Sequence, residues 1–402
     1  MPSNFLLILL LLYDVSMQTT SAALPTKRHY LALDGLRGVA AFLVVIFHLF
    51  EVYANDSIFQ QKLNHGYLAV DFFFLLSGFV VAYAYDDRWN RMSLVDFFKR
   101  RLVRLQPMVV IGTAVGAVFF YLQSGKSFPL IAHTSIGKML LVMLIGMTMI
   151  PIGPSMDIRG WAETYPLDGP AWSLFFEYVA NILYALGIRR VNKKVLGILT
   201  LLSAVLLVHL LVWGPRGDVI GGWSLTPTQL HIGFARLLYP FFAGILLMRL
   251  GLHLRVRGSF FVCSALLLAV LCWPRIGTSQ TLWANGIFEA ISIIVVFPLI
   301  VLIGAGQEPP PGLTTKLCRF LGDISYPLYI THYALIYTYW EWVRGKHIPA
   351  LEGALVGAGV FVAAVAIAYA CLKLYDEPLR AWLGRRFLSK RSAVTESQPV
   401  TK

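Results

Sequence analysis

The sequence predicts an all-α polytopic membrane protein with about ten transmembrane helices around an intramembrane chamber. Of its 402 residues, 57% are hydrophobic and 14% are charged, which is more apolar side chain than a soluble domain of this length can bury. Long, nearly charge-free runs recur along the chain, as membrane-spanning helices require. Ionisable residues interrupt several of these runs, and such residues usually face the protein interior.

The formal net charge of +13 could suggest a nucleic-acid partner, but its distribution indicates a membrane protein. The Lys and Arg residues lie in short clusters between apolar runs, as cytoplasmic loops of membrane proteins do. We therefore expect membrane lipids, and no nucleic acid, as partners of the basic clusters.

Residues 1–29 form a separate N-terminal segment. "FLLILLLLY" followed by "TTSAAL" resembles the apolar core and cleavage region of a signal peptide, but no basic residue precedes it. Cleavage would also leave Lys27 and Arg28 outside, ahead of the first full span. Two interpretations stay open, namely a cleaved leader within residues 1–24 and a misassigned start.

Eleven apolar segments follow, and the charged loops decide how many of them cross. The segments are 34–53, 67–85, 107–122, 136–152, 171–187, 195–213, 231–250, 258–274, 284–304, 320–340 and 351–374.

The segment 136–152 decides the topology. If it crosses, the basic clusters at 188–194, at 249–257 and in the C-terminal tail all fall outside. If it is re-entrant or packs without crossing, all three become cytoplasmic. We therefore expect ten crossings in one membrane domain (30–380), a basic and partly disordered cytoplasmic tail (381–402), and both termini in the cytoplasm.

The first span, "YLALDGLRGVAAFLVVIFHLF", carries Arg37 and His48. Eleven residues make three helical turns with about 20° left over, so both side chains share one face, roughly 16 Å apart along the axis. This places Arg37 near the cytoplasmic mouth and His48 deeper, toward the outer half.

Other ionisable residues are expected at a depth similar to that of His48. The alternative is a set of unrelated structural pairs, but their number favours one functional chamber. The residues are Asp71, Glu177, Arg236, Glu289 and His332.

A neutral imidazole supported by a carboxylate can remove a proton from a hydroxyl group. His48 would be this general base, with Asp71 or Glu177 as its support. The same residue types also form proton relays in pumps and transporters, so both interpretations stay open here.

The stretch "DFFKRRLVRLQP" contains Arg100, Arg101 and Arg104. The simple interpretation is positive-inside charge in contact with lipid phosphates. The functional one is a phosphate site, because guanidinium groups bind phosphate in bidentate fashion. Together with Arg37, this site would hold the phosphorylated end of a long, thin donor whose reactive end reaches His48.

The four Cys residues lie singly in or beside apolar segments, and neither CxxC nor Cys/His spacing occurs. We expect no disulfide and no metal site.

Six motifs, in order over about residues 30–380, resemble those of the acyltransferase-3 family of integral-membrane acyltransferases, which includes bacterial O-acetylases of surface glycans. Each motif alone is weak, but the ordered set is specific. The motifs are "DGLRG…H", "VDFFFLLSGF", "FFKRRLVRLQP", "WSLFFE", "LGDISYPLYITH" and "YDEPLR".

The resemblance implies ten spans in the bacterial inner membrane and an acyl-CoA co-substrate, usually acetyl-CoA, with no permanently bound cofactor. It implies that His48 is catalytic, that Glu177 is important, and that Arg37 and the basic loop bind the CoA end. The acceptor would be a hydroxyl of a carbohydrate or lipid-linked sugar of the cell envelope, such as lipopolysaccharide or another polysaccharide.

Candidate groups for stabilising the reaction's oxyanion or binding the acceptor are Ser173, Arg236, Tyr329 and His332. The competing function is a proton-coupled transporter or flippase of a glycan or lipid precursor. A third interpretation, an interaction subunit, predicts that His48 is dispensable. The acceptor, the acyl length, the choice between direct transfer and an acyl-His48 relay, and the oligomeric state stay open.

Overall fold

The computed structural model describes residues 29–54 and 57–388, and its regular structure there is helical apart from one isolated bridge between Gly125 and Phe128. The predicted signal-like segment and the end of the predicted tail lie outside the described residues.

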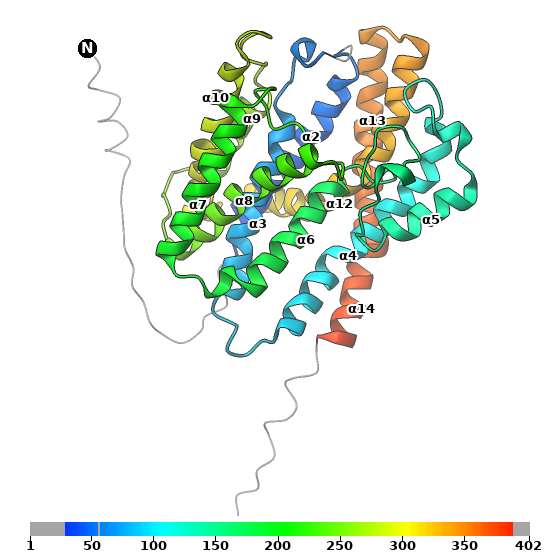
Figure 1. Ribbon diagram of the computed structural model, residues 1–402. Helices are drawn as coiled ribbons and strands as arrows, with labels where there is room; N and C mark the ends of the chain where they lie inside the picture. The colour runs from blue at the N-terminus through cyan, green and yellow to red at the C-terminus, as the bar shows by residue number, and fades with distance from the viewer. Residues whose placement is uncertain (1–28, 55–56, 389–402) are drawn as a thin grey trace, which may run out of the picture.

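The longer helices follow one another along the chain and stand side by side in the molecule (Figure 1). They are α2 (Leu31–Glu51), α3 (Ala69–Tyr85), α4 (Leu94–Phe119), α5 (Ile136–Gly146), α6 (Ala171–Leu186), α7 (Lys193–Val208), α8 (Pro227–Leu250), α9 (Ser259–Leu271), α10 (Leu282–Ile291), α11 (Phe297–Gly306), α12 (Leu313–Lys346), α13 (Ala350–Ala370) and α14 (Glu377–Phe387).

Seven helical stretches within the described residues are long and apolar enough to cross a membrane. They are Leu31–Glu51, Gly66–Tyr85, Leu94–Gln123, Lys193–Trp213, Pro227–Leu250, Leu282–Gly306 and Ala350–Phe387. The shorter apolar helices α5, α6 and α9, together with the 34-residue α12, account for the other predicted segments. The chain is thus a multi-pass membrane protein, and the count of ten crossings stays a prediction.

The segment 136–152 contains a single short helix, α5. Its 11 residues extend over about 16 Å at 1.5 Å per residue, which is roughly half of the hydrocarbon thickness of a bilayer. The remaining residues of this segment form a turn and an irregular stretch.

Helix α4 begins earlier than the sequence predicted. Ser93 and Asp96 form a capping box at its start, which satisfies the first free backbone N–H groups of the helix. The basic cluster is therefore the beginning of this helix, and Pro107 lies inside it. The apolar segment predicted from residue 107 is the later part of this helix, whose start is set by the cap and not by the proline.

Helices α2 and α12 pack closely along much of their length. A Cβ atom added to Gly38 would lie 2.3 Å from the carbonyl oxygen of Leu321, so only glycine allows this approach. Arg37 contacts Gly322 at one level, and the ring of His48 stacks on that of His332 at another. The two helices therefore run in the same direction.

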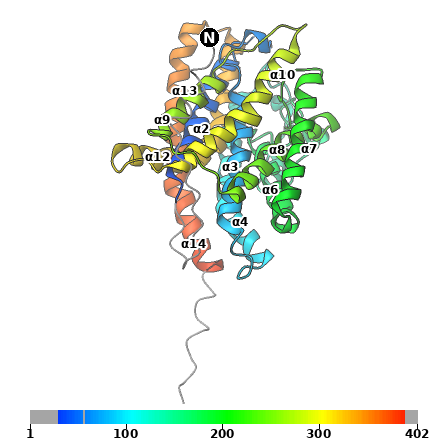
Figure 2. The same ribbon diagram turned by 90° about the vertical axis from the view of Figure 1, so that its left-hand side faces the viewer.

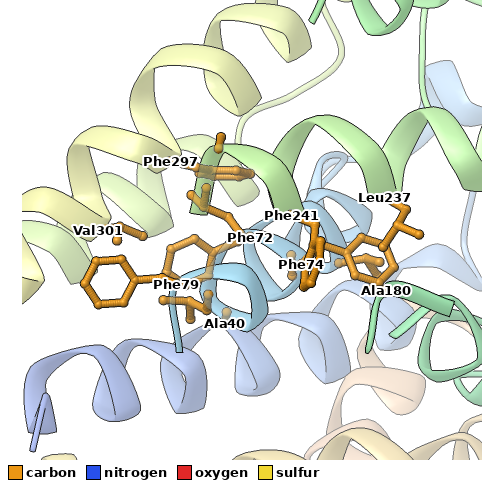
Figure 3. Close-up of a cluster of buried hydrophobic side chains, with 14 of the residues drawn as sticks. Ala40, Phe72, Phe74, Phe79, Ala180, Leu237, Phe241, Phe297 and Val301 are labelled. Carbon is orange, nitrogen blue, oxygen red and sulfur yellow. The ribbon is translucent and has the colours of Figure 1, made fainter. Parts of the chain in front are cut away.

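The main core lies where α3 meets its neighbours. Phe72 and Phe79 of α3 pack among side chains of α2, α6, α8 and α11 (Figure 3). These rings are at most 2% exposed, and burying each one stabilises the fold by roughly 1.5–3 kcal/mol.

The loop after α3, the turn between α6 and α7, and α14 lie at one end of the molecule, opposite the connection between α12 and α13 (Figures 1 and 2). Basic clusters lie at this end, one in the loop after α3 and the start of α4 (86–106) and one in the turn between α6 and α7 (188–194). At the C-terminus, α13 continues through a π-helical turn (Cys371–Asp376) into α14, so the predicted domain boundary at residue 380 falls within a helix.

Candidate active site with two cavities

Helix α2 connects two cavities. One, of about 610 Å³, is lined by His48 and is here named the His48 cavity. The other, of about 660 Å³, is lined by Arg37 and is named the Arg37 cavity. Both residues lie in α2, as the sequence predicted, and their eleven-residue spacing places them about 16 Å apart along the helix axis.

The carboxylate that supports His48 is Glu51. Its Oε2 atom lies 2.7 Å from Nδ1 of His48, one turn earlier in the same helix. When Nδ1 donates to this carboxylate, Nε2 carries the free lone pair of a neutral imidazole. Both side chains line the His48 cavity. Sequence reasoning missed Glu51, although its i,i+3 spacing from His48 was visible.

Asp71 does not support His48, and that expectation was wrong. Its carboxylate accepts from Arg236, at 2.7 Å from Nη2 and 3.3 Å from Nε. Both side chains are at most 1% exposed, and a buried carboxylate is stable there only with such a partner. Arg236 also donates to the backbone carbonyls of Tyr67 and Gly221, which holds the wall of the His48 cavity together.

Glu177 lies in the Arg37 cavity, so the expectation that it supports His48 was also wrong. Its Oε1 accepts from Nη2 of Arg101 at 2.6 Å and from the hydroxyl of Ser77 at 3.2 Å. The sequence placed Glu177 in the correct span, but which cation it meets depends on how α4 and α6 pack.

Ser173 and Tyr329 meet between the two cavities. Their hydroxyl oxygens are 2.8 Å apart. Tyr329 and Val70 line both cavities, whereas Trp172 lines only the His48 cavity and Ser173 only the Arg37 cavity. This wall is therefore about one side chain thick.

His332 lies beside His48 and is fully buried. Its Nδ1 is 3.0 Å and 2.9 Å from the backbone carbonyls of Leu328 and Tyr329, so Nδ1 carries the proton. Its Nε2 has no hydrogen-bond partner among the described residues. The rings of His48 and His332 are stacked, with centroids 5.7 Å apart.

Three of the four predicted phosphate ligands line the Arg37 cavity. They are Arg37, Arg101 and Arg104. Arg37 is anchored by hydrogen bonds to Ser325 and to the carbonyl of Gly322. Arg100 is exposed and lies outside the cavity wall. Sequence reasoning missed Arg319 and Arg380, which line the same cavity from α12 and α14.

Glu163, in the connection between α5 and α6, lines the His48 cavity. Burial raises its pKa to about 7, against the opposing effects of Arg159 and of a hydrogen bond from Tyr337. Across residues 29–54 and 57–388, no group of three or more His, Cys, Asp or Glu side chains is arranged to hold a metal ion.

The model of the acyltransferase-3 family, described as an acyltransferase domain, matches residues 30–373. The chain belongs to the acyltransferase-3 family. The resemblance found in the sequence motifs is thereby confirmed, and the protein is an acyltransferase.

Several known proteins are similar to this acyltransferase over part or most of its length. Protein 2 in the picA locus of Rhizobium radiobacter is 33% identical over 192 residues, which is 46% of this chain and 95% of that protein. Acyltransferase MdmB of Streptomyces mycarofaciens is 27% identical over 397 residues, which is 92% of this chain and 95% of that protein.

O-acetyltransferase OatA of Staphylococcus aureus is 25% identical over 324 residues, or 77% of this chain. The match spans only 51% of OatA, so this chain corresponds to about half of that protein. No solved structure matches.

Proposed function

We propose that this acyltransferase moves an acetyl group from cytoplasmic acetyl-CoA to a hydroxyl of a cell-envelope carbohydrate. The observation that carries the proposal is the pair of cavities with a shared wall. One is lined by five arginines, and the other by His48 paired with Glu51 and by three arginines. Family membership supports acyl transfer, and the name of OatA supports O-acetylation by a relative.

The proposed orientation puts the Arg37 cavity on the cytoplasmic side of a bacterial inner membrane. The end of the molecule with α14 carries the basic loops, as the positive-inside rule expects. Ten crossings, with α5 not crossing, then leave both termini in the cytoplasm.

The acceptor would enter the His48 cavity from the outer side. Four tryptophans line this cavity, and their flat apolar faces suit the faces of sugar rings. They are Trp161, Trp172, Trp223 and Trp340.

The proposed chemistry begins with Nε2 of His48. It takes the proton of the acceptor hydroxyl while the oxygen attacks the thioester carbon, and Glu51 stabilises the imidazolium that forms. The hydroxyl of Tyr329, which reaches both cavities, would donate to the oxyanion, with Ser173 beside it. When the C–S bond breaks, the imidazolium returns its proton to the CoA thiolate. A relay through acetyl-His48 would use the same groups in two steps.

The direct test follows label from radioactive acetyl-CoA in membranes that contain wild type, His48→Ala or His253→Ala. His253 is an exposed histidine outside both cavity walls, so its substitution is the matched control. Glycan label that is lost only in His48→Ala supports the proposal, and additional label on the protein supports the relay. If neither glycan nor protein carries His48-dependent label at normal expression, a proton-coupled transporter or flippase becomes the better proposal.

A further inference from the structure

The charges around the Arg37 cavity are not all neutralised by one another. Most of its acidic side chains already have a basic partner. Asp34 lies 3.4 Å from Arg37, Glu177 2.6 Å from Arg101, Asp376 2.7 Å from Arg380, and Glu377 2.5 Å from Lys373.

Two guanidinium groups on this wall are uncommitted. Within the part of the chain that the structure describes, Arg104 of α4 and Arg319 of α12 make no hydrogen bond or ion pair. Arg319 does not pair even with Asp323, four residues further along the same helix. The Nε–H groups of Arg101 and Arg380 are also without an acceptor among these residues. Arg104 and Arg319 are exposed, whereas these two Nε–H groups are buried, and buried donors without a protein acceptor usually await a ligand or water.

The packing of α12 on α4 brings the face of α12 that carries Arg319 to the same cavity as Arg104. The hydroxyl of Tyr326 donates to the carbonyl of Leu105 at 2.8 Å, which joins the two helices next to Arg104. Arg319 precedes Tyr326 by seven residues, almost two whole turns, so both side chains leave α12 on the same face. Both line the Arg37 cavity.

The position of Arg319 along the axis fits the far end of a long donor. His332 of α12 stacks on His48, and Gly322 contacts Arg37. Arg319 lies thirteen residues before His332, which is about 20 Å along the helix. It therefore lies beyond Gly322 on the side of the Arg37 cavity that faces away from His48.

We propose that Arg319, together with Arg104, clamps the phosphate groups of the CoA donor, so that the donor's charged end is held between α4 and α12. Paired guanidinium groups are the usual ligands of phosphate. This proposal rests on the proposed function, because it takes acyl-CoA as the donor. It assigns a ligand to Arg319, which lies outside the sequence motifs discussed above.

The test measures acetyl transfer against the concentration of acetyl-CoA for wild type, Arg319→Gln, Arg319→Lys and Lys316→Gln. Lys316 is exposed one turn earlier on α12 and does not line the cavity, so Lys316→Gln removes the same charge elsewhere. For Arg319→Gln we expect KM for acetyl-CoA to rise about tenfold or more with kcat within about twofold. The KM of Arg319→Lys should lie between those of wild type and Arg319→Gln, and the KM of Lys316→Gln should equal that of wild type.

A second donor, 3′-dephospho-acetyl-CoA, locates the contact. If Arg319 binds the 3′-phosphate, Arg319→Gln and wild type will have the same KM for this donor. If it binds the diphosphate, the difference will persist. Either result supports the clamp.

Two outcomes would overturn the proposal, and they differ. If wild type is active and Arg319→Gln has an unchanged KM, Arg319 does not bind the donor, although the proposed function still stands. The arginine would then bind lipid phosphates instead. Wild type that neither transfers acetyl from acetyl-CoA nor is thermally stabilised by CoA would remove the proposed function itself. Stabilisation by CoA also shows whether an inactive variant is still folded.

Discussion

The hydrogen bond between His48 and Glu51 gives the imidazole of His48 one defined tautomer. A glutamine at position 51 keeps the size of the side chain but removes the charge that stabilises an imidazolium. We expect Glu51→Gln to lower kcat roughly 10²-fold with little change in KM. Steady-state transfer assays would measure this effect. Equal activity of the variant and wild type over the whole pH range would show that Glu51 has only a structural role.

Glu163 makes the stability of the folded protein fall as the pH rises. Its pKa in the folded protein is about 7, against 4.5 for the ordinary side chain, so the folded state binds the proton more tightly. Its stabilising contribution is complete below about pH 4.5 and is lost as the pH rises through about 7, by at most about 1.4 kcal/mol per pH unit.

Glu163→Gln should therefore lose less thermal stability than wild type between about pH 5 and about pH 8. Melting curves in detergent at several pH values would measure the difference. Parallel curves for the two proteins would contradict the raised pKa.

At the scale of helices, the contact between α2 and α12 holds the two cavities in line. Gly38→Ala would place a methyl group 2.3 Å from the carbonyl oxygen of Leu321, so the helices must separate. We expect a loss of roughly 1–3 kcal/mol in stability, together with lower activity because Arg37 and His48 shift relative to α12.

Gly359→Ala is the control for this substitution. Gly359 lies within α13, where an added Cβ has no heavy atom within 4 Å, so helix propensity should make this change neutral or slightly stabilising. Thermal unfolding of both variants would measure the difference. If Gly38→Ala is as stable as Gly359→Ala, the close approach of α2 and α12 is not needed.

For the whole molecule, the proposed orientation can be tested without measuring activity. Arg91 lies in the loop after α3, and Thr278 lies in the connection between α9 and α10, at the opposite end of the molecule (Figure 1). In a variant without its four native cysteines, a membrane-impermeant maleimide added to intact cells whose outer membrane has been opened should label Thr278→Cys but not Arg91→Cys. Labelling in the reverse order would invert the proposed topology.

The sequence predicted the helical fold and much of the candidate site because these depend on local periodicity. The spacing of Arg37 and His48 follows from one helix, and the basic cluster is a continuous stretch. The partners of Asp71 and Glu177 could not be predicted, because each depends on which face of a distant helix packs beside it. Arg319 was missed for the same reason, since only the packing of α12 against α4 brings it to the cavity that Arg104 also lines.

The wall formed by Val70 and Tyr329 also bears on how the membrane stays sealed. If two water-filled cavities that open toward opposite sides of a bilayer were joined, protons would leak across the membrane. In the proposed orientation, the side chain of Tyr329 blocks this leak and is also part of the candidate active site. In the proposed function the acyl group crosses this wall, so the donor and the acceptor would have to fill the two cavities while it passes.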